Sequence, residues 1–134
     1  MSRTWPVALA LLALLGGSAA SQSIQGPALD RVMRKKLAVS QKILEAVVTS
    51  RWADLESQSR ELETLTNDPA WIVLKAPEYG RHSREFRDAA RALHDAAAAR
   101  DLEETPKAYI ALTLSCVECH RYLARNRLAA QRPR

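Results

Sequence analysis

The five residues Cys116-Val117-Glu118-Cys119-His120 are the stretch around which the rest of this sequence is organised. Their spacing is the C-x-x-C-H pattern by which a c-type haem is covalently attached. In a helix, positions i, i+3 and i+4 share one face, so both thiols can reach the two haem vinyl groups while the imidazole lies beneath the iron. The stretch therefore predicts one haem c, attached at Cys116 and Cys119, with His120 as the proximal axial ligand.

The alternatives for these two cysteines, the only two in the chain, are a redox pair, a zinc half-site and a disulfide. A thioredoxin-like pair follows a strand, whereas Leu112, Leu114 and Tyr122 place this pair inside an apparent helical run. A structural zinc ion takes four ligands, and the sequence has no second Cys or His pair at ligand spacing. Haem attachment is the preferred interpretation because its motif is the most specific.

Residues 1–20 have the pattern of a signal peptide. Arg3 supplies the positive charge, residues 7–15 form an apolar run, and residues 17–20 form a small-residue cleavage site. The apolar run is well short of the ~20 residues that a membrane-spanning helix needs, so no stable membrane insertion is expected. We predict export to the periplasm and a mature chain of residues 21–134.

The mature chain is long enough for one domain with one hydrophobic core. The sequence contains only 4 glycines and is rich in alanine, leucine and arginine, which favours helices over strands. We expect residues 21–134 to form a single haem-binding helical domain of the all-α class.

Apolar residues recur at helical spacing in segments 29–51, 52–66 and 78–100. A fourth helix is predicted to begin with Thr105 as its N-cap and Pro106 at its first position, and it carries the cysteine motif. The residues expected on the apolar faces are Leu29, Met33, Leu37, Ser40, Leu44 and Val47 in the first helix, Leu55, Ser59, Leu62 and Leu65 in the second, and Tyr79, His82, Phe86, Ala90, Leu93 and Ala97 in the third.

Four helices with short connections favour an antiparallel up-down-up-down four-helix bundle, whose core commonly holds cofactors. In that topology the start of the first helix, the end of the second, the start of the third and the end of the fourth meet. We therefore expect the haem to be bound at this end. The apolar segment 71–74, after the helix-ending Asn67-Asp68-Pro69, is expected to cover part of the core and to roof the cofactor.

The sixth iron position requires a thioether, an imidazole, water or nothing. Met33 is the preferred candidate, because it is the only methionine of the mature chain and lies on the apolar face near the start of the first helix. His82, near the start of the third helix, is the second candidate, as a ligand or as a propionate partner. His94 lies further round that helix and further from the haem end.

Four helices, a C-x-x-C-H motif in the last one, and Arg31, Met33 and Leu37 in the first resemble the class II cytochromes c, the cytochrome c′ family and its low-spin relatives. The resemblance implies a distal Met33 in the low-spin manner, with Leu37 as the alternative distal residue. It also implies that Arg31 or Arg34 pairs with a haem propionate. The sequence departs from the family after the motif, because Tyr122 and Arg125 stand two and five positions after His120.

The leading functional hypothesis is a soluble electron carrier, since one haem with His and Met ligands needs no catalytic residues. The alternative is a five-coordinate cytochrome c′-like protein that binds nitric oxide or carbon monoxide. A haem-free structural or metal-binding helical module is the third hypothesis. No nucleophile, base and orienting group are recognisable together, so no enzymatic activity is predicted.

The formal net charge is +5, and it is unevenly placed. If the haem end comprises residues 25–40, 65–87 and 118–134, it carries 13 basic and 5 acidic residues, whereas residues 41–64 and 88–117 carry 6 basic and 10 acidic residues. Opposite potentials steer transient redox complexes, so we expect redox partners with an acidic docking face. Solubility is the alternative explanation of these charges. No nucleic-acid partner is expected, and the oligomeric state stays open between a monomer and a homodimer.

Overall fold

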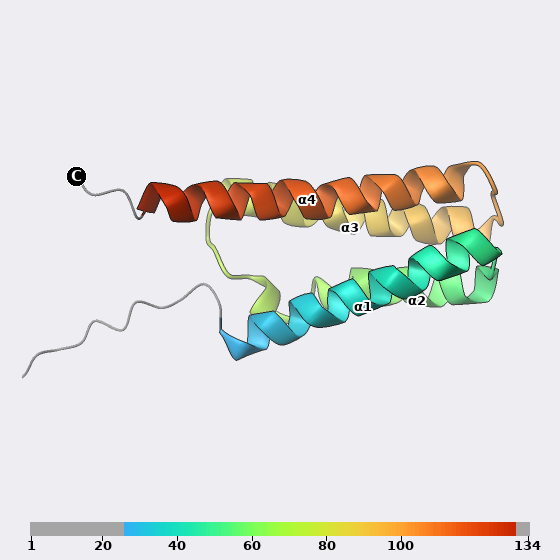
Figure 1. Ribbon diagram of the computed structural model, residues 1–134, viewed down its shortest axis with the longest axis horizontal. Coiled ribbons are helices and arrows are strands. Elements are labelled where there is room, and N and C mark those ends of the chain that lie inside the picture. Colours follow the sequence, from blue (N-terminus) through green and yellow to red (C-terminus); the bar gives the residue numbers. More distant parts are fainter. Residues whose placement is uncertain (1–25, 131–134) are drawn as a thin grey trace, which may run out of the picture.

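In the computed structural model, residues 26–130 are described, with side chains for residues 26–127, and this part contains four α-helices and no strand. The helices are α1 (Pro27–Thr49), α2 (Trp52–Leu65), α3 (Pro77–Ala98) and α4 (Glu104–Ala130), and a single 3₁₀ turn, η1 (Pro69–Trp71), lies between α2 and α3. All four helices run along the long axis of the molecule (Figure 1). The all-α prediction is confirmed for this part, and its architecture is compatible with a four-helix bundle. The predicted signal peptide, residues 1–20, lies outside the described residues.

The third helix buries the face that its sequence predicts. All six residues expected on the apolar face of α3 are buried, and so are all four expected in α2. Phe86, Leu55, Leu62 and Leu93 are among the largest fully buried side chains. The core therefore lies mainly where α3 packs against α2 and α4.

The prediction for the first helix is wrong in detail. Leu37 and Leu44 are 60% and 48% exposed. The buried face of α1 consists instead of Val32, Lys36, Val39, Ile43 and Ala46, while Met33 and Val47 pack partly buried against the core. Both sets of residues have helical spacing, and packing against α2 selects the second set.

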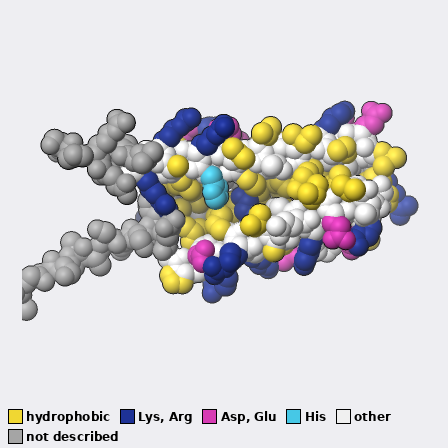
Figure 2. Space-filling view, viewed as in Figure 1, with side chains coloured by type: hydrophobic (Ala, Val, Ile, Leu, Met, Phe, Trp, Pro, Cys, Tyr) yellow, Lys and Arg dark blue, Asp and Glu magenta, His cyan; other side chains and the backbone are white. Residues whose placement is uncertain are grey.

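The exposed hydrophobic residues of α1 have counterparts in α4. Ile110, Leu114 and Val117 are also exposed, and hydrophobic side chains gather along the face on which α1 and α4 lie (Figure 2). No helix within residues 26–130 combines the length and the hydropathy needed to cross a bilayer.

The start of α4 also differs from the prediction. Thr105 is buried within the first turn and is not the N-cap. Asp101 Oδ1 accepts hydrogen bonds from the backbone N–H groups of Glu103 and Glu104, each at 2.9 Å. Aspartate accepts hydrogen bonds from free N–H groups at a helix start as well as threonine does. The helix therefore begins before Thr105, and Pro106, which was predicted at its first position, lies within its first turn.

The connector between α2 and α3 covers the core through one side chain. Trp71 is buried, its ring lies 5.2 Å from that of Phe86, and its indole N–H donates to Ser83 Oγ at 3.1 Å. The prediction that residues 71–74 cover part of the core is only partly correct, because Ile72 is 67% exposed. Asp68 Oδ1 accepts from the N–H of Ala70 at 2.8 Å and begins the η1 turn that turns Trp71 inward.

Candidate cofactor site

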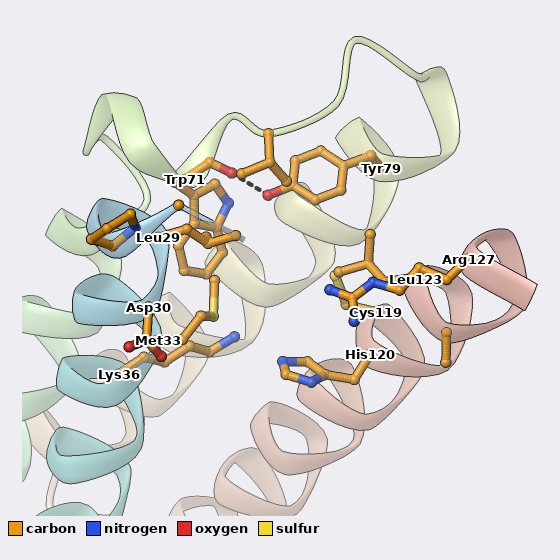
Figure 3. A pocket seen from close by; sticks show the side chains of 14 residues that line it. Leu29, Asp30, Met33, Lys36, Trp71, Tyr79, Cys119, His120, Leu123 and Arg127 are labelled. Carbon is orange, nitrogen blue, oxygen red and sulfur yellow. Dashed lines mark hydrogen bonds between the residues drawn. The ribbon is translucent and has the colours of Figure 1, made fainter. Parts of the chain in front are cut away.

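A cavity of about 720 Å³ opens at one end of the helices. Its volume lies within the ~300–1,000 Å³ typical of ligand and cofactor pockets. Four elements or their flanks contribute to its walls (Figure 3). The lining residues are Gly26, Pro27, Leu29, Asp30, Met33 and Lys36 at α1, Trp71 and Val73 in and after η1, Tyr79 of α3, and Cys119, His120, Leu123, Ala124 and Arg127 of α4.

The α4 wall carries most of the cysteine motif. Cys119 and His120 line the cavity, and the His120 ring points across it toward α1 (Figure 3). Cys116 is half-buried one turn earlier on α4 and packs against the hydrophobic core. The whole motif is helical, as the i, i+3, i+4 argument requires.

The opposite wall carries two side chains from consecutive turns of α1. Met33, the predicted sixth ligand, lines the cavity, and Lys36 lies beside it (Figure 3). Leu37, the predicted alternative distal residue, does not line the cavity, because it lies on the exposed side of α1. The sequence interpretation missed Lys36, although its spacing from Val32 and Val39 was a signal that it belongs to the buried face.

Lys36 has an unusual environment for a lysine, since its side chain is only 7% exposed. Its Nζ lies 3.7 Å from the centre of the Phe86 ring and 4.8 Å from that of Trp71, within the range of cation–π contacts. Burial lowers the pKa of this amine, while the neighbouring Cys116 and Cys119 oppose the shift. The contacts that replace water around the Lys36 amine are therefore aromatic rings.

Burial also changes the acidity of the motif. It lowers the pKa of His120, and the charge of Lys36 lowers it further. Both effects favour the neutral imidazole, which is the form that binds a metal. Burial raises the pKa of the Cys119 thiol, against the opposing effect of Lys36.

Tyr79 and Trp71 close the cavity on the side of α3. The Tyr79 hydroxyl donates a hydrogen bond to the backbone carbonyl oxygen of Trp71 (Figure 3). Burial raises the pKa of Tyr79, so the phenol stays protonated. The bond holds the connector against the start of α3.

The two other histidines, His82 and His94, do not line this cavity. His82 is buried beside Tyr122, with ring centres 5.3 Å apart, and its Nδ1 lies 3.2 Å from Glu85 Oε2. It borders a separate hollow between α3 and α4. The prediction of His82 as the reserve ligand is therefore not supported by its position. The Nε2 atom of His94 lies 2.8 Å from a guanidinium nitrogen of Arg60 in α2.

The arginines are arranged differently from the prediction. Arg31 is exposed and does not line the cavity, and Arg34 forms an ion pair with Asp30. Arg127 of α4, which was not predicted as a site residue, lines the cavity, and its guanidinium is directed from α4 toward the other lining residues (Figure 3). The arginine at the cavity wall thus comes from α4 rather than from α1.

The chemistry of the cavity fits a haem. One wall carries an imidazole and a thiol, with a second thiol one turn away. The opposite wall carries a thioether and an amine. Leu29, Trp71, Val73 and Leu123 supply apolar surface for a porphyrin plane, and Arg127 suits a propionate.

Within residues 26–130, no group of three or more His, Cys, Asp or Glu side chains is arranged to hold a metal ion. Comparison of the chain with protein-family models, with curated proteins and with solved structures finds no match.

Proposed function

We propose that the protein is an exported monohaem c-type cytochrome that acts as a soluble electron carrier. The observation that carries this proposal is the meeting of Cys119 and His120 of α4 with Met33 of α1 in one cavity. Haem c would be attached through thioether bonds at Cys116 and Cys119. His120 would be the proximal ligand and Met33 the sixth ligand.

The proposal includes an antiparallel up-down-up-down bundle with the cofactor at one end. It is supported by the set of segments that line the cavity, which are the start of α1, the residues after α2, the start of α3 and the C-terminal half of α4. These are the segments that alternate chain direction would bring together. The short connections between α1 and α2 and between α3 and α4 agree with it.

Each lining residue has a distinct task in this proposal. The His120 imidazole and the Met33 thioether would hold the iron, and Trp71 and Leu29 would keep water from the site. The haem supplies a one-electron change at its iron, which is all that an electron carrier requires. Met33 and an apolar wall favour the reduced state, in which the site has less charge to bury, so the reduction potential should exceed that of an exposed haem with two histidine ligands.

The partner proposal rests on the exposed basic residues near the cavity. Lys75, Arg84, Arg121 and Arg125 are all exposed in the segments that surround it. Lys36, counted as part of this charge from the sequence, is buried and does not contribute to a docking surface. We propose that a redox partner with an acidic face docks there, guided by electrostatic attraction.

The absorption spectrum of protein matured in a periplasm tests the proposal. A low-spin six-coordinate spectrum in both oxidation states is expected of the electron carrier. A high-spin five-coordinate ferrous spectrum that changes with carbon monoxide would favour the ligand-binding alternative. A protein without a Soret band would contradict both.

A further inference from the structure

Lys36 is an unusual residue for its position in the hydrophobic core. It occupies a position of α1 whose neighbours on the same face are Val32, Val39 and Ile43. A buried lysine is normally paired with a carboxylate, because an unpaired ammonium is unstable away from water. Within the described part of the chain, Lys36 forms no ion pair, and its amine lies over the rings of Phe86 and Trp71.

The direction of the Lys36 side chain instead indicates a role at the cavity. Lys36 lines the cavity together with His120, and its amine end is directed from α1 toward the His120 ring (Figure 3). Met33 reaches the same cavity from one turn earlier. The wall opposite the proximal histidine thus offers two donor atoms, a sulfur and a nitrogen.

We propose that the amine nitrogen of Lys36 is a second protein ligand for the sixth iron position, in competition with the Met33 thioether. This inference rests on the proposed function, since it requires the attached haem. The coordinate bond uses the lone pair of the neutral amine, so the ammonium proton leaves to solvent when the bond forms. Neither ligand exchange nor proton loss requires an oxidant or a reductant.

The surroundings of Lys36 support this exchange. Burial disfavours its charged form and so lowers the pKa of the amine. Cys116 and Cys119 oppose that shift, but both lose their ionisable thiols when haem is attached. Only the aromatic contacts would then remain to stabilise the ammonium. The harder nitrogen suits ferric iron and the softer sulfur suits ferrous iron, so Lys36 should compete best in the oxidised protein.

Spin state in variants of the haem-loaded protein tests the proposal. Met33→Ala should remain low-spin and six-coordinate in the ferric state, because Lys36 replaces the lost thioether. The double variant Met33→Ala/Lys36→Leu should become high-spin. Met33→Ala/Lys35→Leu is the matched control, since Lys35 is exposed and pairs with Glu61 at 2.9 Å, and it should stay low-spin.

A second double variant distinguishes loss of the ligand from loss of folding. Met33→Ala/Lys36→Arg keeps a cation over the aromatic rings, but arginine does not lose its proton in proteins and has no available lone pair. It should also be high-spin, with helical circular dichroism like that of the parent. A Met33→Ala protein that is already high-spin would overturn the proposal, and so would a low-spin Lys36 double variant.

The same samples separate this inference from the proposed function. If every variant carries a Soret band that survives denaturation, the haem assignment stands and only the spin states decide the role of Lys36. If the parent protein carries no covalent haem, the proposed function and this inference fail together.

Discussion

The amine of Lys36 and the imidazole of His120 face one another across a single cavity, the first from α1 and the second from α4 (Figure 3). The two residues are far apart in the sequence, and the charge of Lys36 contributes to the lowered pKa of His120. Two nitrogen-bearing side chains thus face each other between otherwise apolar walls. The predictions about ligation below depend on this arrangement.

Met33→Ala is predicted to remove the weak near-infrared charge-transfer band that a thioether ligand gives to ferric haem. The reason is that Met33 is the only described sulfur on the wall opposite His120. Near-infrared absorption of the oxidised protein provides the measurement. Leu37→Ala, one turn further along α1 on its exposed side, should leave the band intact. A band that persists in Met33→Ala would show that the thioether of Met33 is not the origin.

Ile43→Ala and Leu44→Ala should have very different effects on folding stability. Ile43 is fully buried, so its truncation should lower the free energy of unfolding by about 2–5 kcal/mol. Leu44 is 48% exposed, and its truncation should change it by only about 0.5 kcal/mol. Urea denaturation of both variants checks the prediction. Equal losses would mean that the buried face of α1 is not the one described above.

Ile43 and Leu44 also show the limit of what a sequence pattern predicts about the buried face of a helix. In α3 only one apolar stripe exists, and Tyr79, Phe86 and Leu93 could be assigned to the core without tertiary information. In α1 two stripes overlap, and the true one contains Lys36, which makes it look polar. The choice between the stripes depends on packing against α2, which no local pattern contains.

The candidate site was predictable where covalent chemistry fixes the spacing. The positions of Cys119 and His120 on one helical face follow from the motif itself, and Met33 was identified by its rarity and position. Lys36 and Arg127 were missed as lining residues, because charged side chains are usually assigned to solvent. Their roles at the cavity depend on how α1 and α4 are oriented relative to each other, which is a tertiary property.

The cap of α4 should give stability a measurable pH dependence. The backbone N–H groups of Glu104 and Glu103 stabilise the charged carboxylate and lower the pKa of Asp101. Its contribution is therefore complete above the ordinary aspartate pKa and is lost as the pH falls through the lower folded value. Asp101→Asn keeps an acceptor oxygen but does not titrate. The difference in melting temperature between the parent and this variant should shrink in acid, whereas a constant difference would contradict the assignment.

Charge reversal near the cavity should slow electron transfer to an acidic partner. Arg84→Glu with Arg125→Glu removes exposed positive charge close to the cavity, which weakens the electrostatic attraction that guides encounter. Stopped-flow rate constants should fall for this variant. They should also fall steeply for the parent as ionic strength rises, because screening shortens to ~8 Å at physiological salt.

The control for that experiment reverses charge elsewhere on the surface. Lys42→Glu with Arg100→Glu changes the net charge by the same amount, at positions in the second half of α1 and after the end of α3, whereas the starts of both helices line the cavity. This variant should react nearly as fast as the parent. Equal slowing by both variants would mean that net charge alone controls the reaction and that no docking surface exists near the cavity.

The central claim is covalent haem attachment at the cysteine motif, and intact-protein mass spectrometry after acid-acetone extraction tests it most directly. We predict that protein matured in a periplasm retains the mass of one haem, and that Cys116→Ser/Cys119→Ser retains none. His120→Ala should keep the covalent mass if haem is still attached, but it should lose the native axial spectrum. A parent chain that releases all its haem into acid acetone, or a double cysteine variant that retains it, would contradict the account.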